Sequence, residues 1–252
     1  MLRYNKIMTN LFLYIISILF VIGIITVYIF FYPRNICLED APEYRNRVLI
    51  STSPKHKLNA YCISLKEKHK NRDFIRKEWK EFLDIVFFEA LSNCTESHKH
   101  ILSQIWKYRH HKQHFPVVIM EDDVFRMGDF TKYWDLIYDY PEADYITFDA
   151  TQVDIDENHI KKDFIALKKH TSAGFIVYNQ RFFQRFQTLE DLHKCIGDLI
   201  DTNLTYDQTL VKYHPRKQVC RQVVSKYSTT AKMNNYIQNL TYSTAKNKIE
   251  SV

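Results

Sequence analysis

The sequence predicts an α/β fold whose sheet contains parallel strands, preceded by one transmembrane helix. Short apolar runs typical of buried strands alternate along the chain with segments whose apolar residues recur at helical spacing. The chain has 252 residues, of which 46% are apolar and 25% charged, as in packed globular proteins. A separate stretch of 22 residues, Leu11 to Tyr32, contains no Asp, Glu, Lys, Arg or His.

This N-terminal apolar stretch is long enough to cross a bilayer. A helix of its length spans roughly 33 Å at about 1.5 Å per residue. A secretory signal peptide has a shorter apolar region, of about 7–15 residues, and a small-residue cleavage site, which Phe30 to Arg34 does not offer. We therefore expect a cytoplasmic tail over residues 1–10, an uncleaved anchor over 11–32 and a polar stem over 33–57.

The orientation of the anchor depends on the chain that follows it. Positive charges flank both ends of the apolar stretch, so the positive-inside rule gives little guidance. Three N-x-[S/T] glycosylation patterns begin at Asn93, Asn203 and Asn239, and they favour a luminal body. The sequence thus predicts a single-pass type II membrane protein of the Golgi or endoplasmic reticulum.

The first elements of the body follow from periodicity. Apolar and polar residues alternate over 58–65, which predicts a strand, and apolar residues at helical spacing predict a helix over 69–83. Residues 84–89 form a short apolar run typical of a buried strand. A second helix is expected over 96–111, and a second buried strand over 115–120.

The later elements are bounded by clear start and stop signals. Asp129 is a good N-cap for the next helix, and Pro141 ends it. Strands are expected over 143–150 and 172–178, with a polar loop between them. A last helix is predicted over 179–195.

Composition excludes several classes of protein. Only 4 residues are glycine, and their positions allow no dinucleotide-binding turn, phosphate-binding P-loop or G-x-S-x-G elbow. No H-E-x-x-H or C-x-x-C sequence is present, and the five widely spaced cysteines form no recognisable disulfide framework. The net charge of +6 mixes 29 acidic with 35 basic residues, which argues against nucleic acid as a partner.

The most informative feature is the acidic triplet Glu121-Asp122-Asp123 at the end of an apolar strand. Ligands of open α/β sheets bind beyond the carboxyl ends of strands. Crowded carboxylates repel one another unless a cation intervenes, and a hard divalent ion can also bridge to a diphosphate. In strand geometry Glu121 and Asp123 point to one side and Asp122 to the other. The alternative interpretation is a solvated turn.

Several motifs around this triplet occur in the order in which a known protein family has them. They are Ala60–Leu65 followed by Arg72, Ser97-His98, Val118–Val124, Ser172–Tyr178, Tyr206-Asp207-Gln208, and Tyr213-His214-Pro215 leading to Gln222 and Ser225. Together they resemble glycosyltransferase family 25, the lipooligosaccharide and procollagen galactosyltransferase type. The resemblance covers residues 58–230, and residues 231–252 are expected to form a C-terminal tail.

The resemblance implies a GT-A-like nucleotide-sugar-binding fold with a mixed, mostly parallel sheet. It also implies that Glu121 and Asp123 hold Mn²⁺ or Mg²⁺ against the donor diphosphate. Asp122 would touch the donor ribose or sugar, and Arg72 would contact the diphosphate through two hydrogen bonds. The resemblance further implies that the donor is a UDP-hexose.

Four further side chains are candidates for the site. The two candidates for the base that takes the acceptor proton are Asp207, the first choice because of the resemblance, and Asp149, at the end of another strand. Either could instead be a turn or cap residue. His214 is a candidate third metal ligand. His98 is a candidate for binding the donor or orienting a loop, and its alternative is an exposed histidine at a helix start.

The expected activity is inverting transfer of a hexose, by resemblance galactose from UDP-galactose, onto a hydroxyl of a glycan or protein. One rival is a catalytically inactive, membrane-bound binding protein, because Glu89-Ala90-Leu91 replaces the Asp-Gly of the family and its Glu-Ile-Gly-Cys pattern is missing before Ser97. Another rival is a metal-dependent phosphodiesterase that uses the same triplet. The neighbouring His110, His111 and His114 are interpreted as surface residues, since no cysteine or carboxylate accompanies them at metal-binding spacing.

Overall fold

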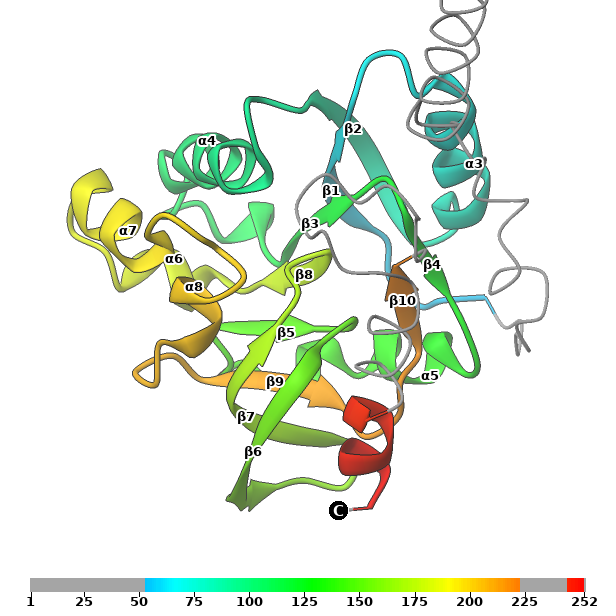
Figure 1. Ribbon diagram of the computed structural model, residues 1–252, viewed down its shortest axis with the longest axis vertical. Coiled ribbons are helices and arrows are strands. Elements are labelled where there is room, and N and C mark those ends of the chain that lie inside the picture. The colour runs from blue at the N-terminus through cyan, green and yellow to red at the C-terminus, as the bar shows by residue number, and fades with distance from the viewer. Residues whose placement is uncertain (1–52, 223–243, 252) are drawn as a thin grey trace, which may run out of the picture. The chain divides into compact units, whose positions relative to one another are not determined.

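The computed structural model describes residues 53–222 and 244–251, all within one compact unit of the chain, residues 36–252 (Figure 1). The predicted tail and anchor, and the stem up to residue 52, lie outside the described residues. Within the described residues, no helix combines the length and the apolar character needed to cross a membrane. The four cysteines in this part of the chain, Cys62, Cys94, Cys195 and Cys220, are all free thiols.

A mixed eight-stranded sheet forms the centre of the fold. Its strand order is β2-β1-β3-β8-β5-β9-β7-β6. The strands are β1 Leu58–Ser64, β2 Leu83–Glu89, β3 Val117–Glu121, β5 Tyr145–Thr147, β6 Thr151–Ile160, β7 Phe164–Thr171, β8 Phe175–Tyr178 and β9 Lys212–Pro215. The pairs β1/β2, β1/β3 and β5/β9 are parallel and the other four are antiparallel, so that only β7 and β8 run against the rest. The predicted mixed α/β architecture is confirmed.

Helices cover both faces of this sheet. They are α3 His69–Trp79, α4 Cys94–Trp106, α5 Phe130–Asp135, α6 Gln180–Gln184, α7 Leu189–Ile196 and α8 Asn203–Tyr206, with the 3₁₀ turns η2 Lys112–His114 and η3 Ile137–Asp139. The alternation of β3 explains the two layers: Val118 and Met120 pack with α3 and α5, whereas Ile119 packs with α4 and the α6–α8 group. Figure 1 shows the two sets of helices on opposite sides of the sheet.

Local sequence signals account for several helix ends. The Asp129 side chain accepts a hydrogen bond from the Lys132 amide, as expected for the N-cap of α5. Helix α4 begins two residues before its predicted start, because Asn93 caps it through the Glu96 amide. The single helix predicted over 179–195 is wrong: Thr188 forms a capping box that starts α7 separately from α6.

The largest error in the predicted fold is the polar loop between 150 and 172. This segment forms the antiparallel strands β6 and β7, in which buried Val153 and Ile155 alternate with more exposed polar residues. Residues 244–250, in the expected C-terminal tail, form a helix whose Ala245 and Ile249 pack against these strands. A strand pair with a polar outer face lacks the continuous apolar run that marks a central strand.

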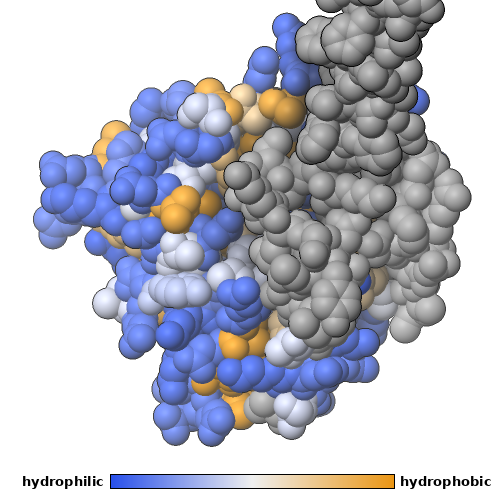
Figure 2. Space-filling model, viewed as in Figure 1, coloured by the Kyte–Doolittle hydropathy of each residue, from blue (hydrophilic) through white to orange (hydrophobic). Residues whose placement is uncertain are grey.

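Three short strands, β4, β9 and β10, were also absent from the prediction. Strand β4, Val124–Arg126, pairs with β10, Cys220–Gln222, and this pairing sets Gln222 opposite Val124, just after the acidic triplet. Strand β2, predicted as buried, lies at the edge of the sheet, where Val86 is 59% exposed. The face seen in Figure 2 is largely hydrophilic over the described residues, with small, separate hydrophobic patches.

Candidate functional site

The carboxyl ends of β1, β3 and β5 meet at one edge of the sheet. Parallel pairing puts Ile63 of β1 beside Glu121 of β3, and Asp149 follows β5. Five carboxylates gather near this edge and form what we call the carboxyl-edge cluster. Its members are Glu121, Asp122, Asp123, Asp149 and Asp201. The edge is the one where open α/β sheets bind ligands.

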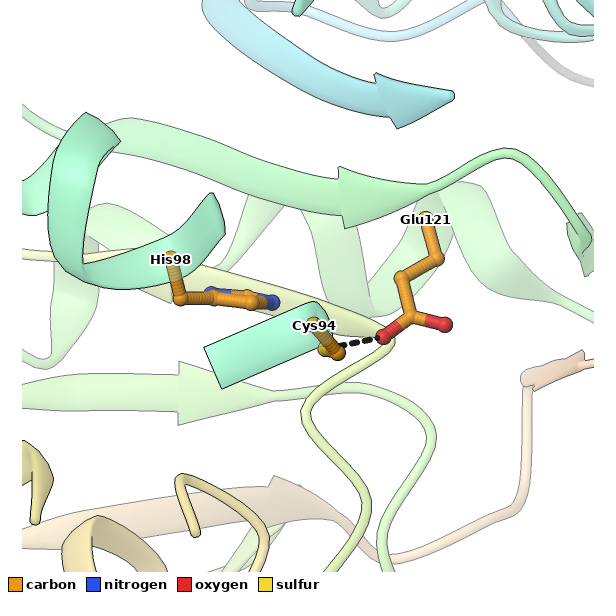
Figure 3. Close-up of side chains that lie close together, drawn as sticks. All are labelled: Cys94, His98 and Glu121. Carbon is orange, nitrogen blue, oxygen red and sulfur yellow. Dashed lines mark hydrogen bonds between the residues drawn. The ribbon is translucent and has the colours of Figure 1, made fainter. Parts of the chain in front are cut away.

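Glu121 is held by two neighbours. The Cys94 thiol donates to Oε1 across 2.8 Å, and the Gln222 amide nitrogen donates to Oε2 across 3.1 Å (Figure 3). Burial, followed by the negative charge of Asp123, raises the pKa of Glu121 to about 8. Each carboxylate oxygen therefore accepts a hydrogen bond, and at neutral pH the Glu121 side chain retains a proton for much of the time.

Asp122 faces a different set of partners. The Ser64 hydroxyl donates to its Oδ2 across 2.7 Å, and Lys68 Nζ lies 3.3 Å from Oδ1. Arg72 donates from Nε to the Ser64 hydroxyl and from Nη2 to the Ser64 carbonyl. Burial lowers the pKa of Lys68, but Asp122 and Asp123 outweigh it and the net shift is upward. A cationic pair thus flanks the cluster on the α3 side.

Asp123 is the least satisfied member of the cluster. Its Oδ1 atom is shielded from solvent and has no hydrogen-bond partner among the residues that the structure describes. Burial and the charge of Asp122 raise its pKa to about 7. A shielded carboxylate oxygen without a donor is costly, and a cation is the partner that would satisfy it.

Asp149 accepts hydrogen bonds from the Ser172 hydroxyl, at 2.6 Å, and from the Phe175 amide, at 3.1 Å. Burial raises its pKa to about 6, with those bonds opposing the shift. Ser172 holds a left-handed φ of +80°, which is strained for a residue with a Cβ. A Cβ on Gly174 would come within 2.5 Å of Asp149 Oδ2 and 2.3 Å of Gln222 Nε2. The chain therefore closes tightly around this carboxylate.

Two members of this region were missed by the sequence analysis. Asp201 is exposed at the rim, accepts a hydrogen bond from the Ala173 amide, and adds negative charge that raises the pKa of Glu121 and of Asp149. Lys68 lies one helical turn before Arg72, and that spacing was the available signal for it. Asp201 follows no strand, so nothing in its local pattern marked it.

Asp207 and His214, two further predicted site residues, lie outside the carboxyl-edge cluster. Asp207 follows α8, where partial burial raises its pKa but hydrogen bonds from the hydroxyl and amide of Thr209 produce a net lowering. His214 is buried on β9 between β5 and β7, its Nδ1 lies 2.5 Å from the Pro215 carbonyl oxygen, and burial lowers its pKa to about 4. Neither belongs to the set of ligand atoms around Glu121.

His98 is not the exposed residue that its alternative interpretation expected. It is fully buried rather than exposed at a helix start, and burial lowers its pKa to about 3. Neither ring nitrogen has a hydrogen-bond partner among the described residues. Within the described chain, the one set of three or more metal-ligating side chains with close ligand atoms is Cys94, His98 and Glu121, whose atoms lie within 4.8 Å of one another (Figure 3). His110, His111 and His114 are exposed, as expected.

A separate hollow of about 150 Å³ lies at the opposite, amino ends of β1 and β3. Ala60, Tyr61, Val86 and Ile105 are among the side chains that line it, with Asp84 at its margin. The members of the carboxyl-edge cluster are not part of its lining. The candidate site therefore rests on the chemistry at the carboxyl edge and not on this hollow.

No family model and no curated protein matches the chain. Among solved structures, it is similar to A197 from STIV, with 11% identity, a TM-score of 0.42, and coverage of 63% of this chain and 81% of that one. HddC from Yersinia pseudotuberculosis gives 9% identity, a TM-score of 0.36, and coverage of 62% and 68%. Mouse xyloside xylosyltransferase 1, in its apo form, gives 10% identity, a TM-score of 0.32, and coverage of 57% and 61%.

Proposed function

We propose that this protein is a metal-dependent glycosyltransferase that uses a nucleotide-sugar donor. The observation that carries the proposal is the unpartnered oxygen of Asp123 within the carboxyl-edge cluster, where the carboxyl ends of parallel strands meet. A divalent cation would neutralise this charge and would bridge to the diphosphate of a donor. The resemblance of the motif order to glycosyltransferase family 25 supports the same proposal.

Asp123 is the proposed ligand of Mn²⁺ or Mg²⁺. Its buried, donor-free oxygen fits a hard cation that prefers oxygen ligands. Both oxygens of Glu121 already accept hydrogen bonds, from Cys94 and Gln222, so we propose Glu121 as a weaker ligand of the same ion. His214, which is buried on β9 and outside the ligand set around Glu121, is left out of the proposed metal site. When bound, the ion would stabilise the charge that develops on the departing nucleotide.

The donor is proposed to lie against α3. Lys68 and Arg72 supply positive charge beside Asp122, which is where a diphosphate would need it. Asp122 would then contact the ribose or sugar, as the resemblance implies. Lys77 and Lys80, farther along the same basic run, are exposed and are not assigned a role.

Asp149 is proposed as the base that takes the proton of the acceptor hydroxyl. Its pKa of about 6 leaves it mostly ionised at neutral pH but still able to accept a proton. The net lowering of the pKa of Asp207 makes that carboxylate a weaker base. We therefore reverse the order of the two candidates. A base on the far side of the sugar from the leaving nucleotide would give inversion.

The finer parts of the proposal rest on the sequence. By the resemblance, the sugar is a hexose, the galactose of UDP-galactose, and the acceptor is a hydroxyl of a glycan or protein. The apolar stretch 11–32 and the N-x-[S/T] patterns support a type II protein of the Golgi or endoplasmic reticulum with a luminal body.

The experiment is a transfer assay on the full-length chain in detergent. UDP-galactose and other nucleotide sugars would be offered with a panel of glycan and protein acceptors, in Mn²⁺ or in a chelator. We expect transfer in Mn²⁺, lost in chelator and reduced by at least about 100-fold in Asp123→Asn, in line with loss of one preorganised charge-stabilising group. Asp84→Asn is the matched control, because Asp84 is an exposed carboxylate paired with Lys57 at the other end of the sheet.

Two results would overturn the proposal. Metal-dependent nucleotide-sugar binding without turnover on any acceptor would indicate an inactive binding protein. Release of nucleotide at a rate that no acceptor changes would indicate a phosphodiesterase. Transfer that persists in Asp123→Asn would contradict the assigned metal ligand, even if the activity itself is present.

A further inference from the structure

Helix α4 directs two metal-ligating side chains at the end of β3. Cys94 is its first residue and His98 lies one turn later, so both project from the same side of the helix. Figure 3 shows the two side chains facing Glu121, with the thiol bonded to the carboxylate. The arrangement joins a sulfur, an imidazole nitrogen and a carboxylate oxygen from two different elements.

The histidine of this group is the unusual member. The imidazole of His98 is fully buried, and neither nitrogen has a partner among the described residues. A neutral imidazole carries one donor and one acceptor, and burial without partners leaves both unsatisfied. Because burial lowers its pKa to about 3, the ring is neutral at physiological pH, which is the form that binds metals.

The thiol of Cys94 holds its proton against the Glu121 carboxylate, at a position that a cation could occupy instead. Its thiol hydrogen lies between Sγ and a Glu121 oxygen, 2.8 Å apart, where a cation would meet two negative ligands once that proton leaves. Burial and the nearby charges of Glu121, Asp201 and Asp123 hold the pKa of Cys94 well above its ordinary value. The same negative charges would favour a cation in place of the proton.

We propose that Cys94, His98 and Glu121 bind a borderline-soft divalent ion of the zinc type. One thiolate, one imidazole and one carboxylate suit Zn²⁺, whereas Mn²⁺ and Mg²⁺ prefer oxygen alone. The three ligand atoms already lie within 4.8 Å of one another. Ligands at ~2.0–2.3 Å around a tetrahedral ion are roughly 3.5 Å apart, so small side-chain shifts complete the site. Three protein ligands leave the fourth position to solvent or to another group.

Binding balances as a proton exchange. The Cys94 S–H bond breaks, its proton passes to solvent, and a sulfur–metal bond forms together with bonds from the His98 nitrogen and the Glu121 oxygen. Through these ligands, the bound ion links the first turn of α4 to the end of β3. It also occupies Glu121, which leaves Asp123 to hold the hard cation of the donor. Because the site takes up Glu121, which has a share of the donor cation in the proposed function, it is tested by metal binding and not by transfer.

The test measures metal binding without any nucleotide. The full-length chain in detergent would be stripped with a chelator, reloaded with Zn²⁺ and assayed by elemental analysis. It would then be loaded with Co²⁺, whose bond to a thiolate gives a charge-transfer absorption. We expect a single equivalent of Zn²⁺ and that absorption in the native chain. Cys94→Ser should abolish the absorption, and His98→Gln should weaken Zn²⁺ binding by at least about 100-fold, since even partners outside the ligand set are worth ~10–100-fold.

The matched control is Cys195→Ser. Cys195 is also a partly buried thiol beside a carboxylate, Asp207 Oδ2 at 3.6 Å, and it belongs to no metal-ligating group. This variant should bind Zn²⁺ and Co²⁺ as the native chain does. A native chain that retains no Zn²⁺, or a cobalt–thiolate absorption that survives in Cys94→Ser and disappears in Cys195→Ser, overturns the proposal.

A measurement on the native chain covers the case in which a variant fails to fold. Alkylation of each cysteine would be followed by mass spectrometry with Zn²⁺ present and in chelator. We expect Zn²⁺ to slow alkylation of Cys94 by about tenfold or more relative to Cys195, because a metal-bound thiolate is a poor nucleophile for the reagent. Equal rates at Cys94 in the two conditions contradict the site.

Discussion

Two regions of this protein each place a cysteine beside a carboxylate, and the two carboxylates behave in opposite ways. At the end of β3, Cys94 donates to Glu121 across 2.8 Å, and burial raises the pKa of Glu121 to about 8. Cys195 of α7 lies 3.6 Å from Asp207, which follows α8 and whose pKa is lowered. The carboxyl beside Cys94 therefore holds a proton, whereas the carboxyl beside Cys195 is ionised.

The difference comes from the donors and charges around each pair. Asp207 is partly exposed and receives two hydrogen bonds from Thr209, which stabilise its charged form. Glu121 is shielded and lies in the field of Asp123, Asp149 and Asp201, which destabilises its charged form. A region of the second kind gains most from a cation or from accepting a proton. This contrast places the candidate chemistry at the carboxyl-edge cluster.

The largest expected effect is a difference in transfer rate between variants of the two candidate bases, Asp149 and Asp207. Asp149→Asn should lower transfer by about 10²–10⁴-fold, the usual worth of a general base, while Asp207→Asn should leave the rate close to that of the native chain. A pH–rate profile should show activity falling as pH drops below about 6, where Asp149 takes up a proton. A collapse in Asp207→Asn with Asp149→Asn spared would reverse the comparison.

A smaller effect is expected on the α3 side of the cluster. Lys68→Met should raise the KM for the nucleotide sugar by about tenfold or more, because a hydrogen bond to a charged group is worth ~1.5–3 kcal/mol. Lys80→Met is the control, since Lys80 is exposed at the end of α3 and forms an ion pair with the neighbouring Glu81. Equal KM values in the two variants would remove Lys68 from the donor site.

The close packing of the chain around Asp149 can be tested by substituting Gly174. Gly174→Ala would force a methyl group to within 2.5 Å of the Asp149 carboxylate, and should cost about 1–3 kcal/mol of stability and reduce transfer. Gly128→Ala is the control, because Gly128 has φ +58° and a Cβ there meets only Val219 at 4.0 Å. It should lower the melting temperature through backbone strain alone and leave transfer unchanged. Equal losses of transfer would show that the effect is general.

The smallest expected effect is a dependence of stability on pH. A carboxyl whose pKa is higher in the folded chain binds more protons when folded, so stability falls as pH rises. The pKa values of Glu121 and Asp123 rise from 4.5 and 3.8 to about 8 and 7. His98, His170 and His214, with lowered pKa values, act in the opposite sense but only below 6.5.

Between pH 6.5 and 8 the two carboxylates therefore dominate, and Lys212, whose pKa burial lowers to about 8, opposes them toward the upper end of this window. Across it, the melting temperature of the metal-free protein should fall by several degrees, at roughly 2–4 °C per kcal/mol for a chain of this size. Saturating Mn²⁺ should flatten the slope, and so should Asp123→Asn without metal. A melting temperature that rises across this window would contradict the shielded, mutually repelling carboxylates.

The central part of the fold could be predicted from sequence because its signals are local. The apolar runs of β1, β3 and β8 alternate along the chain with segments whose apolar residues repeat at helical spacing, so their type and order follow from periodicity. β6 and β7 could not be predicted in this way. Their charged residues, among them Asp154 and Lys168, face outward and hide the buried alternation of Val153 and Ile155.

The candidate site was predictable only in part. The acidic triplet stands at a strand end, and its place at the sheet edge follows from that. His98 was a predicted candidate, but its partner Cys94 was missed because the predicted helix started at residue 96 and left Cys94 outside it. The Asn93 cap was the signal that would have moved the start. The bond from Gln222 to Glu121 joins residues far apart in sequence through the short β4/β10 pairing, which no local pattern marks.

The most direct test of the account is to locate the hard cation itself. Crystals of the full-length chain would be grown with Mn²⁺ and UDP, and the anomalous signal of manganese would be mapped. The account predicts a peak within coordination distance of Asp123 Oδ1, beside the diphosphate and on the Lys68 side of the cluster, and no such peak in Asp123→Asn. Manganese bound elsewhere, or UDP bound at the carboxyl edge without any manganese at Asp123, would contradict it.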